Sequence, residues 1–248
     1  MSELLAVQQI SKSFRGLKAL ANVSFEIQPN TIAALIGPNG AGKTTLFNII
    51  AGAQTADRGA IVFDGRRIDG LRPDQICHLG IARTFQIVKT FAGLTVLDNV
   101  VVGALGHYAR VKEACEHADT ILEVVGLGPK RNLPSAMLTL PDRKLLELAR
   151  ALATRPKLLL LDEVLGGLRP TECDRVLELL RSIAEREGIT LILIEHVMRA
   201  VMALAHTVIV LHHGEVIAQG RPSDIVRHSA VLDCYLGVEI GDNDAGHL

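Results

Sequence analysis

The chain has 248 residues, of which 48% are hydrophobic and 21% are charged, a composition typical of a folded globular protein. Lysine and arginine total 26 against 27 for aspartate and glutamate, so the net charge of -1 provides no general attraction for nucleic acid. The longest apolar stretches, such as Val201 to Leu211, are shorter than the ~20 residues that a membrane-spanning helix needs. We therefore expect one main folded domain over residues 1–248, and neither a DNA-binding nor a membrane-spanning chain.

The start of the chain and its cysteines indicate the compartment. The first ten residues show no basic patch followed by an apolar run and a cleavage site, so a cytoplasmic location is expected. Cys77, Cys115, Cys173 and Cys234 lie far apart without a C-x-x-C pair, which argues against a zinc site and against a disulfide framework.

Three short apolar or alternating runs open the chain and predict strands at 5–10, 23–27 and 32–36. The third run ends at a glycine, and the pattern from Lys43 to Ile50 is helical. Strand, glycine-rich turn and helix in this order are typical of the unit from which parallel sheets are built.

The turn in this unit fits the phosphate-binding pattern G-x-x-x-x-G-K-[ST]. Glycines let backbone amides wrap around phosphates, and the following helix adds about half a positive charge at its first turn. We expect Lys43 to meet the outer phosphates and Thr44 to offer its hydroxyl to Mg²⁺. The predicted ATP-binding loop comprises Gly37, Pro38, Asn39, Gly40, Ala41, Gly42, Lys43, Thr44 and Thr45.

Residues from about 93 to 154 have helical periodicity with glycine and proline punctuation, and predict a helical subdomain inserted between residues 1–92 and 155–248. The polar residues 239–248 are expected to form a loose tail. The elements predicted from position 95 onward are helices at 95–104, 112–125, 142–153 and 171–187, strands at 158–161 and 190–194, and a hairpin of 208–211 with 215–219.

Two acids follow the buried run LLLL, at Asp162 and Glu163. Because ligands of parallel sheets bind at the carboxyl ends of strands, we expect Asp162 to hold Mg²⁺ through water. Glu163 is then placed to orient and deprotonate the attacking water. Adjacent acids at a strand end are also common in plain loops, and it is the phosphate-binding pattern that favours the functional interpretation here.

These motifs, in this order, resemble the nucleotide-binding subunits of ABC transporters over nearly the whole chain. The resemblance rests on GPNGAGKTT and LLLLDE and on three further stretches, SKSFRGLKAL, IARTFQIVKTF and LILIEHVM. It implies that Phe14 stacks on adenine, that Gln86 senses the γ-phosphate and Mg²⁺, and that His196 contacts the γ-phosphate. It also implies an α/β fold: a P-loop NTPase core with a mixed sheet, an N-terminal antiparallel β portion and an inserted helical subdomain.

One motif departs from the family pattern. Where the family usually shows L-S-G-G-Q, this chain has Leu138, Thr139, Leu140, Pro141 and Asp142, so that both glycines are replaced. Thr139 followed three residues later by Asp142 is typical of a capping box, and proline is tolerated in a first helical turn. The resemblance implies that this helix start faces the ATP held by the opposite subunit, and we expect the carboxylate of Asp142 to turn back and cap the helix.

The stretches G-L-T-V-L-D-N-V and D-C-Y-L-G look like those of subunits that serve importers of branched-chain and other hydrophobic amino acids. The resemblance implies an ATPase that couples ATP-driven dimerisation to transport, as a homodimer or a heterodimer with a related subunit. Its implied partners are integral membrane permease subunits, with the chain peripheral on the inner face of the cell membrane, and indirectly a solute-binding protein.

Two alternatives remain open at this point. The altered signature allows a degenerate ATP-binding subunit with weak hydrolysis, paired with an active mate. A soluble ABC ATPase that acts on the ribosome or DNA is disfavoured by the single phosphate loop and by the neutral net charge.

Overall fold

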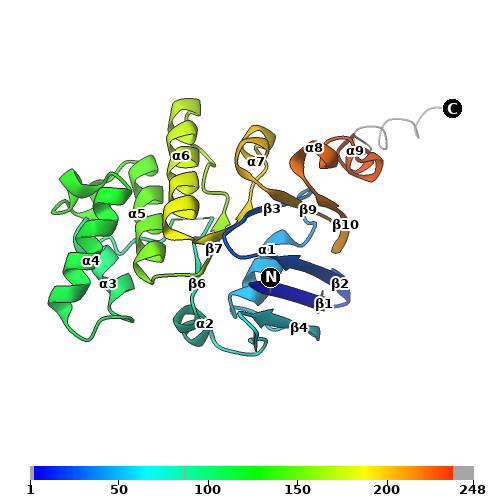
Figure 1. Ribbon diagram of the computed structural model, residues 1–248, viewed down its shortest axis with the longest axis horizontal. Helices are drawn as coiled ribbons and strands as arrows, with labels where there is room; N and C mark the ends of the chain where they lie inside the picture. Colours follow the sequence, from blue (N-terminus) through cyan, green and yellow to red (C-terminus); the bar gives the residue numbers. More distant parts are fainter. Residues whose placement is uncertain (1–2, 87, 237–248) are drawn as a thin grey trace. The chain divides into compact units, whose positions relative to one another are not determined.

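The computed structural model describes residues 3–86 and 88–236 (Figure 1). The chain divides into two compact units: Met1–Ile50, Gln54–Gly70 and Ile194–Leu248 form the first, and Ala51–Ala53 with Leu71–Leu193 form the second. The tail predicted to be loose, residues 239–248, lies outside the described residues. The boundary predicted near residues 93 and 154 stays a prediction.

An antiparallel sheet opens the first unit, with the strand order β2-β1-β4-β5. Residues along the second half of β2 alternate between buried and exposed, and Val23, Phe25 and Ile27 are buried, as in a sheet with one covered face. The strands are β1 (Leu5–Phe14), β2 (Leu17–Ile27), β4 (Arg58–Phe63) and β5 (Arg66–Arg67). The expected N-terminal antiparallel portion is confirmed.

The first unit also contains mixed strand pairing. β3 (Ile32–Ile36) runs parallel to β9 (Thr207–His212), which is antiparallel to β10 (Glu215–Gly220). All five residues of β3 are buried, which explains its continuous apolar sequence. The helices of this unit are α1 (Lys43–Ile50), α7 (Met198–Leu204), α8 (Pro222–Ile225) and α9 (Ser229–Leu236).

In the second unit, β6 (Ile81–Arg83) runs parallel to β7 (Leu158–Asp162), and β8 (Thr190–Ile194) is the other neighbour of β7. Every residue of β7 and β8 is buried. Helix α6 (Pro170–Glu187) connects these two strands, and α2 (Pro73–Leu79) precedes β6.

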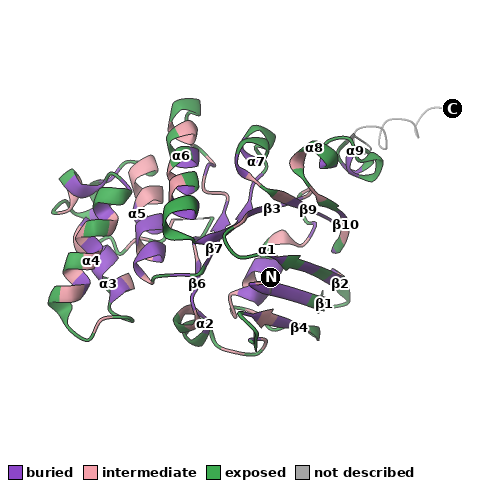
Figure 2. Ribbon diagram, viewed as in Figure 1, coloured by how far each residue is buried: buried purple, intermediate pink, exposed green. Residues whose placement is uncertain are grey.

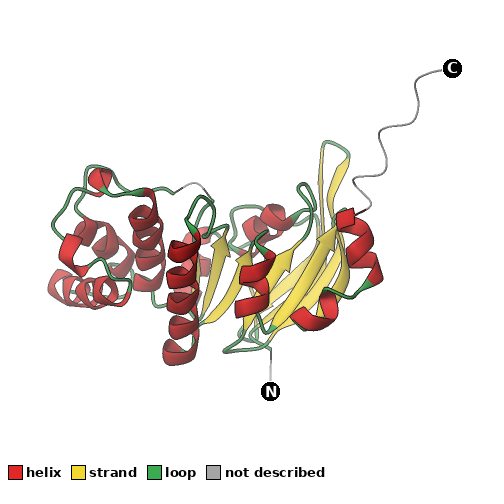
Figure 3. Cartoon of the chain, turned by 90° about the horizontal axis from the view of Figure 1, so that it is seen from above, coloured by secondary structure: helices red, strands yellow, loops and turns green. Residues whose placement is uncertain are grey.

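The helical part of the second unit is formed by α3 (Val96–Ala104), α4 (Val111–Val124) and α5 (Leu140–Ala153), with short 3₁₀ turns at Gly128–Lys130 and Ser135–Met137. These helices pack together, and this part of the chain is drawn as helix and loop only (Figures 1 and 3). Their inward faces are buried (Figure 2) and are rich in small residues. Among the described residues, no helix has the length and apolar character needed to cross a bilayer.

Candidate functional site

The predicted phosphate loop joins β3 to α1 in the first unit. Gly37 and Gly42 have φ values of 151° and 106°, a region that residues with a side chain rarely adopt. A Cβ atom at Gly42 would lie 2.5 Å from the carbonyl oxygen of Ala19, and one at Gly37 would overlap the carbonyl oxygen of Leu211. The path of the loop therefore requires glycine at both positions.

Lys43 is the first residue of α1, and its ammonium group turns back into the loop. Nζ donates hydrogen bonds to the carbonyl oxygens of Gly37 at 2.7 Å and Pro38 at 2.9 Å. The ammonium thus lies beside the loop backbone at the positive end of the α1 dipole, where an anion is stabilised. Together with the exposed Thr44, this arrangement fits a nucleotide phosphate tail.

Phe14 and His196 also belong to the first unit, and the structure leaves both accessible. Phe14 ends β1 with 42% of its surface exposed, and the ammonium of Lys12 lies 5.5 Å from the centre of its ring. An exposed aromatic face can stack on a base, whereas a core phenylalanine could not. His196 is exposed and lies two residues after β8.

In the second unit, Asp162 is the last residue of β7 and only 2% of it is exposed. Its Oδ2 accepts a hydrogen bond from Nη2 of Arg83 at 2.9 Å, and its backbone amide donates to Oγ1 of Thr84 at 3.2 Å. A buried carboxylate needs a cationic partner, and Arg83 supplies one. The stretch IARTFQIVKTF contains Arg83, but no pattern in the sequence assigns it a role, because the pair joins two strands that are distant along the chain.

Glu163 follows β7 in a left-handed backbone conformation, with φ of 51°. Nε2 of Gln86 donates a hydrogen bond to its Oε2 at 2.8 Å, and Nζ of Lys144 donates to its backbone carbonyl at 3.0 Å. The structure therefore brings together two predicted site residues, Gln86 and Glu163, that are 77 positions apart. Lys144 is a third member that sequence reasoning missed.

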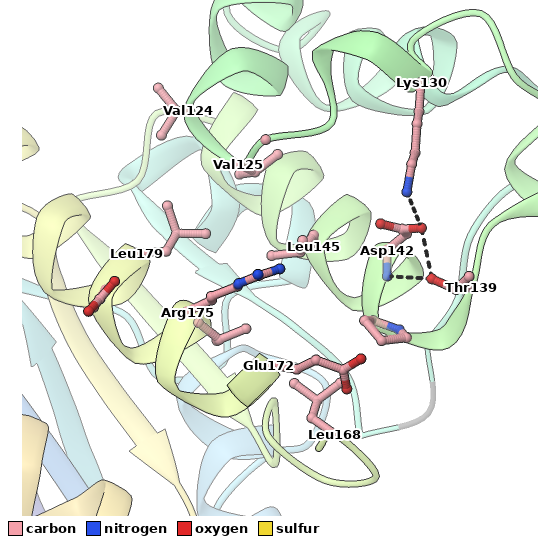
Figure 4. Close-up of a pocket in the computed structure, with 14 residues that line it drawn as sticks. Val124, Val125, Lys130, Thr139, Asp142, Leu145, Leu168, Glu172, Arg175 and Leu179 are labelled. Atoms are coloured by element: carbon pink, nitrogen blue, oxygen red, sulfur yellow. Dashed lines mark hydrogen bonds and ion pairs between the residues drawn. The ribbon is translucent and has the colours of Figure 1, made fainter. Parts of the chain in front are cut away.

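The altered signature forms the start of α5, and Thr139 is its N-cap residue. The backbone amide of Asp142 lies 3.4 Å from Oγ1 of Thr139, and that hydroxyl donates to Oδ2 of Asp142 at 2.7 Å. Nζ of Lys130 lies 2.5 Å from the same carboxylate oxygen (Figure 4). The carboxylate of Asp142 turns back to the helix start as expected, where it accepts from the hydroxyl of Thr139 and is neutralised by Lys130, while the cap itself is the side chain of Thr139.

These three residues line one end of a pocket of about 650 Å³ between α4, α5 and α6 (Figure 4). Partial burial opposes ionisation of Asp142, but the hydrogen bonds from Lys130 and Thr139 outweigh it and lower the pKa of this carboxyl below its usual value. The charge of Asp142 is thus balanced within the chain.

The free energy of unfolding of the Asp142→Asn variant is expected to be roughly 1 kcal/mol below that of the wild type at neutral pH. The variant loses a partly exposed ion pair and a carboxylate at a helix start. Since the folded-state pKa is lowered, this stabilisation is present above the ordinary value of 3.8 and is lost as the pH falls through the lower, folded-state pKa. Urea unfolding of both proteins at several pH values measures the difference. A difference that persists unchanged at the lowest pH would contradict the ion pair as its source.

Comparison with known proteins assigns the chain to a family. The model for "ABC transporter" matches residues 20–166. The high-affinity branched-chain amino acid transport ATP-binding protein LivG of Salmonella typhimurium is 36% identical, with 94% of this chain and 98% of that protein covered. The corresponding protein BraF of Pseudomonas aeruginosa is 34% identical over the same shares. The chain belongs to the ABC transporter family.

Solved structures agree with this assignment. A nucleotide-free ATP-binding cassette from an ABC transporter superposes with a TM-score of 0.87 at 29% identity, covering 97% of this chain and 100% of that chain. The ADP conformation of MJ1267, an ATP-binding cassette of an ABC transporter, gives a TM-score of 0.86 at 30% identity, with 96% and 100% covered. The predicted fold class, with its mixed sheet and antiparallel portion, is confirmed.

Proposed function

We propose that this chain is the ATP-hydrolysing subunit of an ABC importer for branched-chain or other hydrophobic amino acids. The observation that carries hydrolysis, as opposed to binding alone, is the hydrogen bond from Gln86 to the carboxylate of Glu163. It fixes an acceptor for a proton next to an amide that can orient water. The solute class rests on the relatives named as branched-chain amino acid transport proteins.

In this proposal the first unit binds the nucleotide. Backbone amides of the loop 37–45 and the ammonium of Lys43 hold the phosphates, while the ring of Phe14 stacks on adenine. The hydroxyl of Thr44, the amide oxygen of Gln86 and, through water, the carboxylate of Asp162 are the groups that would hold Mg²⁺, all of them oxygen donors of the kind that this ion prefers. Bound Mg²⁺ supplies charge neutralisation on the phosphate oxygens.

Hydrolysis then requires Glu163 to accept a proton from the attacking water. Gln86 holds the carboxylate of Glu163 in position, and His196 is assigned to donate a hydrogen bond to the γ-phosphate. In a dimer with a second copy or a related subunit, residues 138–142 would face the nucleotide of the opposite subunit through the start of α5. Closing and reopening of that dimer would drive membrane permease subunits on the inner face of the membrane, which receive solute from a solute-binding protein.

The test is purification of the tagged chain from membranes, followed by reconstitution of whatever copurifies into vesicles. Recovery of permease subunits, with uptake of leucine or isoleucine that depends on internal ATP, is the expected result. Recovery of ribosomes or DNA without permeases would overturn the import function and support a soluble ABC ATPase.

A second function is favoured by one observation at the altered signature. The hydroxyl of Thr139 already donates to Asp142, so that it is not available as a donor to a phosphate without rearrangement. An ATP-binding subunit with weak hydrolysis, paired with an active mate, would have this property. Phosphate release by the purified chain separates the two functions: steady turnover supports the ATPase, and stable ATP binding without release supports the weak subunit.

A further inference from the structure

Three residues at three-residue spacing on α5 contact the segments that carry Glu163 and Gln86. Lys144, Glu147 and Arg150 follow one another along the helix, and residues three apart are neighbours on a helix surface. Each of them bonds to a backbone atom outside α5. We name these three residues the α5 row.

The first member holds the backbone of Glu163. The carbonyl oxygen of Glu163 accepts hydrogen bonds from Nζ of Lys144 at 3.0 Å and from the backbone amide of Gly166 at 3.1 Å. A left-handed conformation costs a residue other than glycine about 1–2 kcal/mol, and it persists where surrounding contacts fix it. Lys144 provides such a contact from outside the turn, and does so with a charged donor.

The other two members hold the segment around Gln86. Oε1 of the buried Glu147 accepts a hydrogen bond from the backbone amide of Phe85 at 3.1 Å. The guanidinium of Arg150 donates to the backbone carbonyl of Lys89. The segment is thus anchored on both sides of Gln86.

Burial has a defined effect on the two charged anchors. It raises the pKa of Glu147, an effect that the amide of Phe85 and then Arg150 partly oppose. It lowers the pKa of Arg150, partly opposed by Glu147. Glu147 is buried and Arg150 is half-buried, and a charge that is removed from water is retained where its hydrogen bonds are made, as they are here.

We propose that the α5 row is a positioning device for hydrolysis, in which Lys144 orients Glu163 while Glu147 and Arg150 hold Gln86 against it. This inference rests on the proposed role of Glu163 as the base. The row itself touches neither nucleotide nor water in this assignment. It acts through the 2.8 Å hydrogen bond between Gln86 and Glu163, whose geometry it sets from both sides.

The Lys144→Met variant keeps most of the apolar stem of the side chain and removes its ammonium group. We expect kcat to fall roughly 10- to 100-fold, because small displacements of a catalytic group cost about this much. KM and ATP affinity are expected to stay within about twofold, since the phosphate loop is untouched. Lys144→Arg should recover most of the activity, and Lys112→Met on α4, where the side chain is 87% exposed, should have no effect.

A double variant distinguishes positioning from a general structural role. If Lys144 acts through Glu163, adding Lys144→Met to Glu163→Gln should slow hydrolysis no further, because the group that it orients has already lost its function. If the double variant is slower than the wild type by the product of the two single-variant losses in kcat, the proposal is overturned. A loss of ATP affinity in Lys144→Met alone would also overturn it.

Amide hydrogen exchange tests the α5 row without reference to hydrolysis. In Lys144→Met the amide of Gly166, which shares the carbonyl of Glu163, is expected to exchange roughly tenfold faster, as loss of a charged hydrogen bond predicts. If the wild type shows no turnover but exchange at Gly166 still becomes faster in Lys144→Met, the proposed ATPase activity is overturned and the anchoring of the Glu163 backbone by the α5 row stands. Unchanged exchange would overturn the α5 row even if the wild type hydrolyses ATP.

Discussion

The Glu163→Gln variant is expected to bind ATP as the wild type does and to hydrolyse it roughly 10²- to 10⁴-fold more slowly, the usual contribution of a general base. The substitution is nearly isosteric, and an amide oxygen can still accept the hydrogen bond from Gln86. Only the capacity to take a proton is lost. Single-turnover hydrolysis and nucleotide titration measure the two quantities separately.

The control for this variant is Glu185→Gln, which makes the same change at an exposed position on α6. Its turnover should match that of the wild type. Substantial turnover in Glu163→Gln would remove Glu163 from the role of base and leave Asp162 as the acid to examine next.

The Lys43→Ala variant is expected to lose ATP affinity by roughly 10- to 100-fold, because hydrogen bonds between charged groups contribute about 1.5–3 kcal/mol. The ammonium lies within the loop, bonded to the carbonyls of Gly37 and Pro38, so its removal takes away the only side-chain cation that the phosphate motif itself places there. Calorimetric titration with ATP measures the change.

Lys112→Ala serves as the matched control, since it removes one lysine charge from the surface of α4. The effect should grow with the number of phosphates, so that ADP affinity falls less than ATP affinity. Equal affinities of Lys43→Ala and the wild type for ATP would show that the loop binds something else.

Elements with strong local patterns could be predicted from the sequence. The strands 32–36 and 190–194 and the helix 43–50 have the predicted bounds, because each is an unbroken apolar run or a helical pattern next to a glycine turn. The strand Arg58–Phe63 was missed because its apolar stretch is short. Its pairing with β1 stabilises it as a strand, and such pairing is not visible in the local sequence pattern. Helix α2 was missed because it has only seven residues.

The site residues divide in the same way, into those that a local pattern reveals and those that depend on a partner elsewhere in the chain. The residues of the phosphate loop and the pair Asp162 and Glu163 lie in contiguous motifs whose spacing is set by backbone chemistry, and a sequence shows such spacing directly. Arg83, Lys130 and Lys144 act through partners that are 79, 12 and 19 positions away, and a lysine or arginine outside a motif is usually solvent-exposed. Only the folded chain shows which of its many lysines and arginines have partners of this kind.

Helix α5 begins at the Thr139 cap and carries the α5 row in its following turns. Since successive helical residues are rotated by about 100°, inserting one residue between the cap and Lys144 would swing the whole row to a different side of the helix. The stretch from the cap to Arg150 is therefore expected to tolerate exchanges of residue type on its outward side but no change of length. Changes of residue type in the signature are therefore compatible with the positions that α5 gives to the row, whereas insertions and deletions are not.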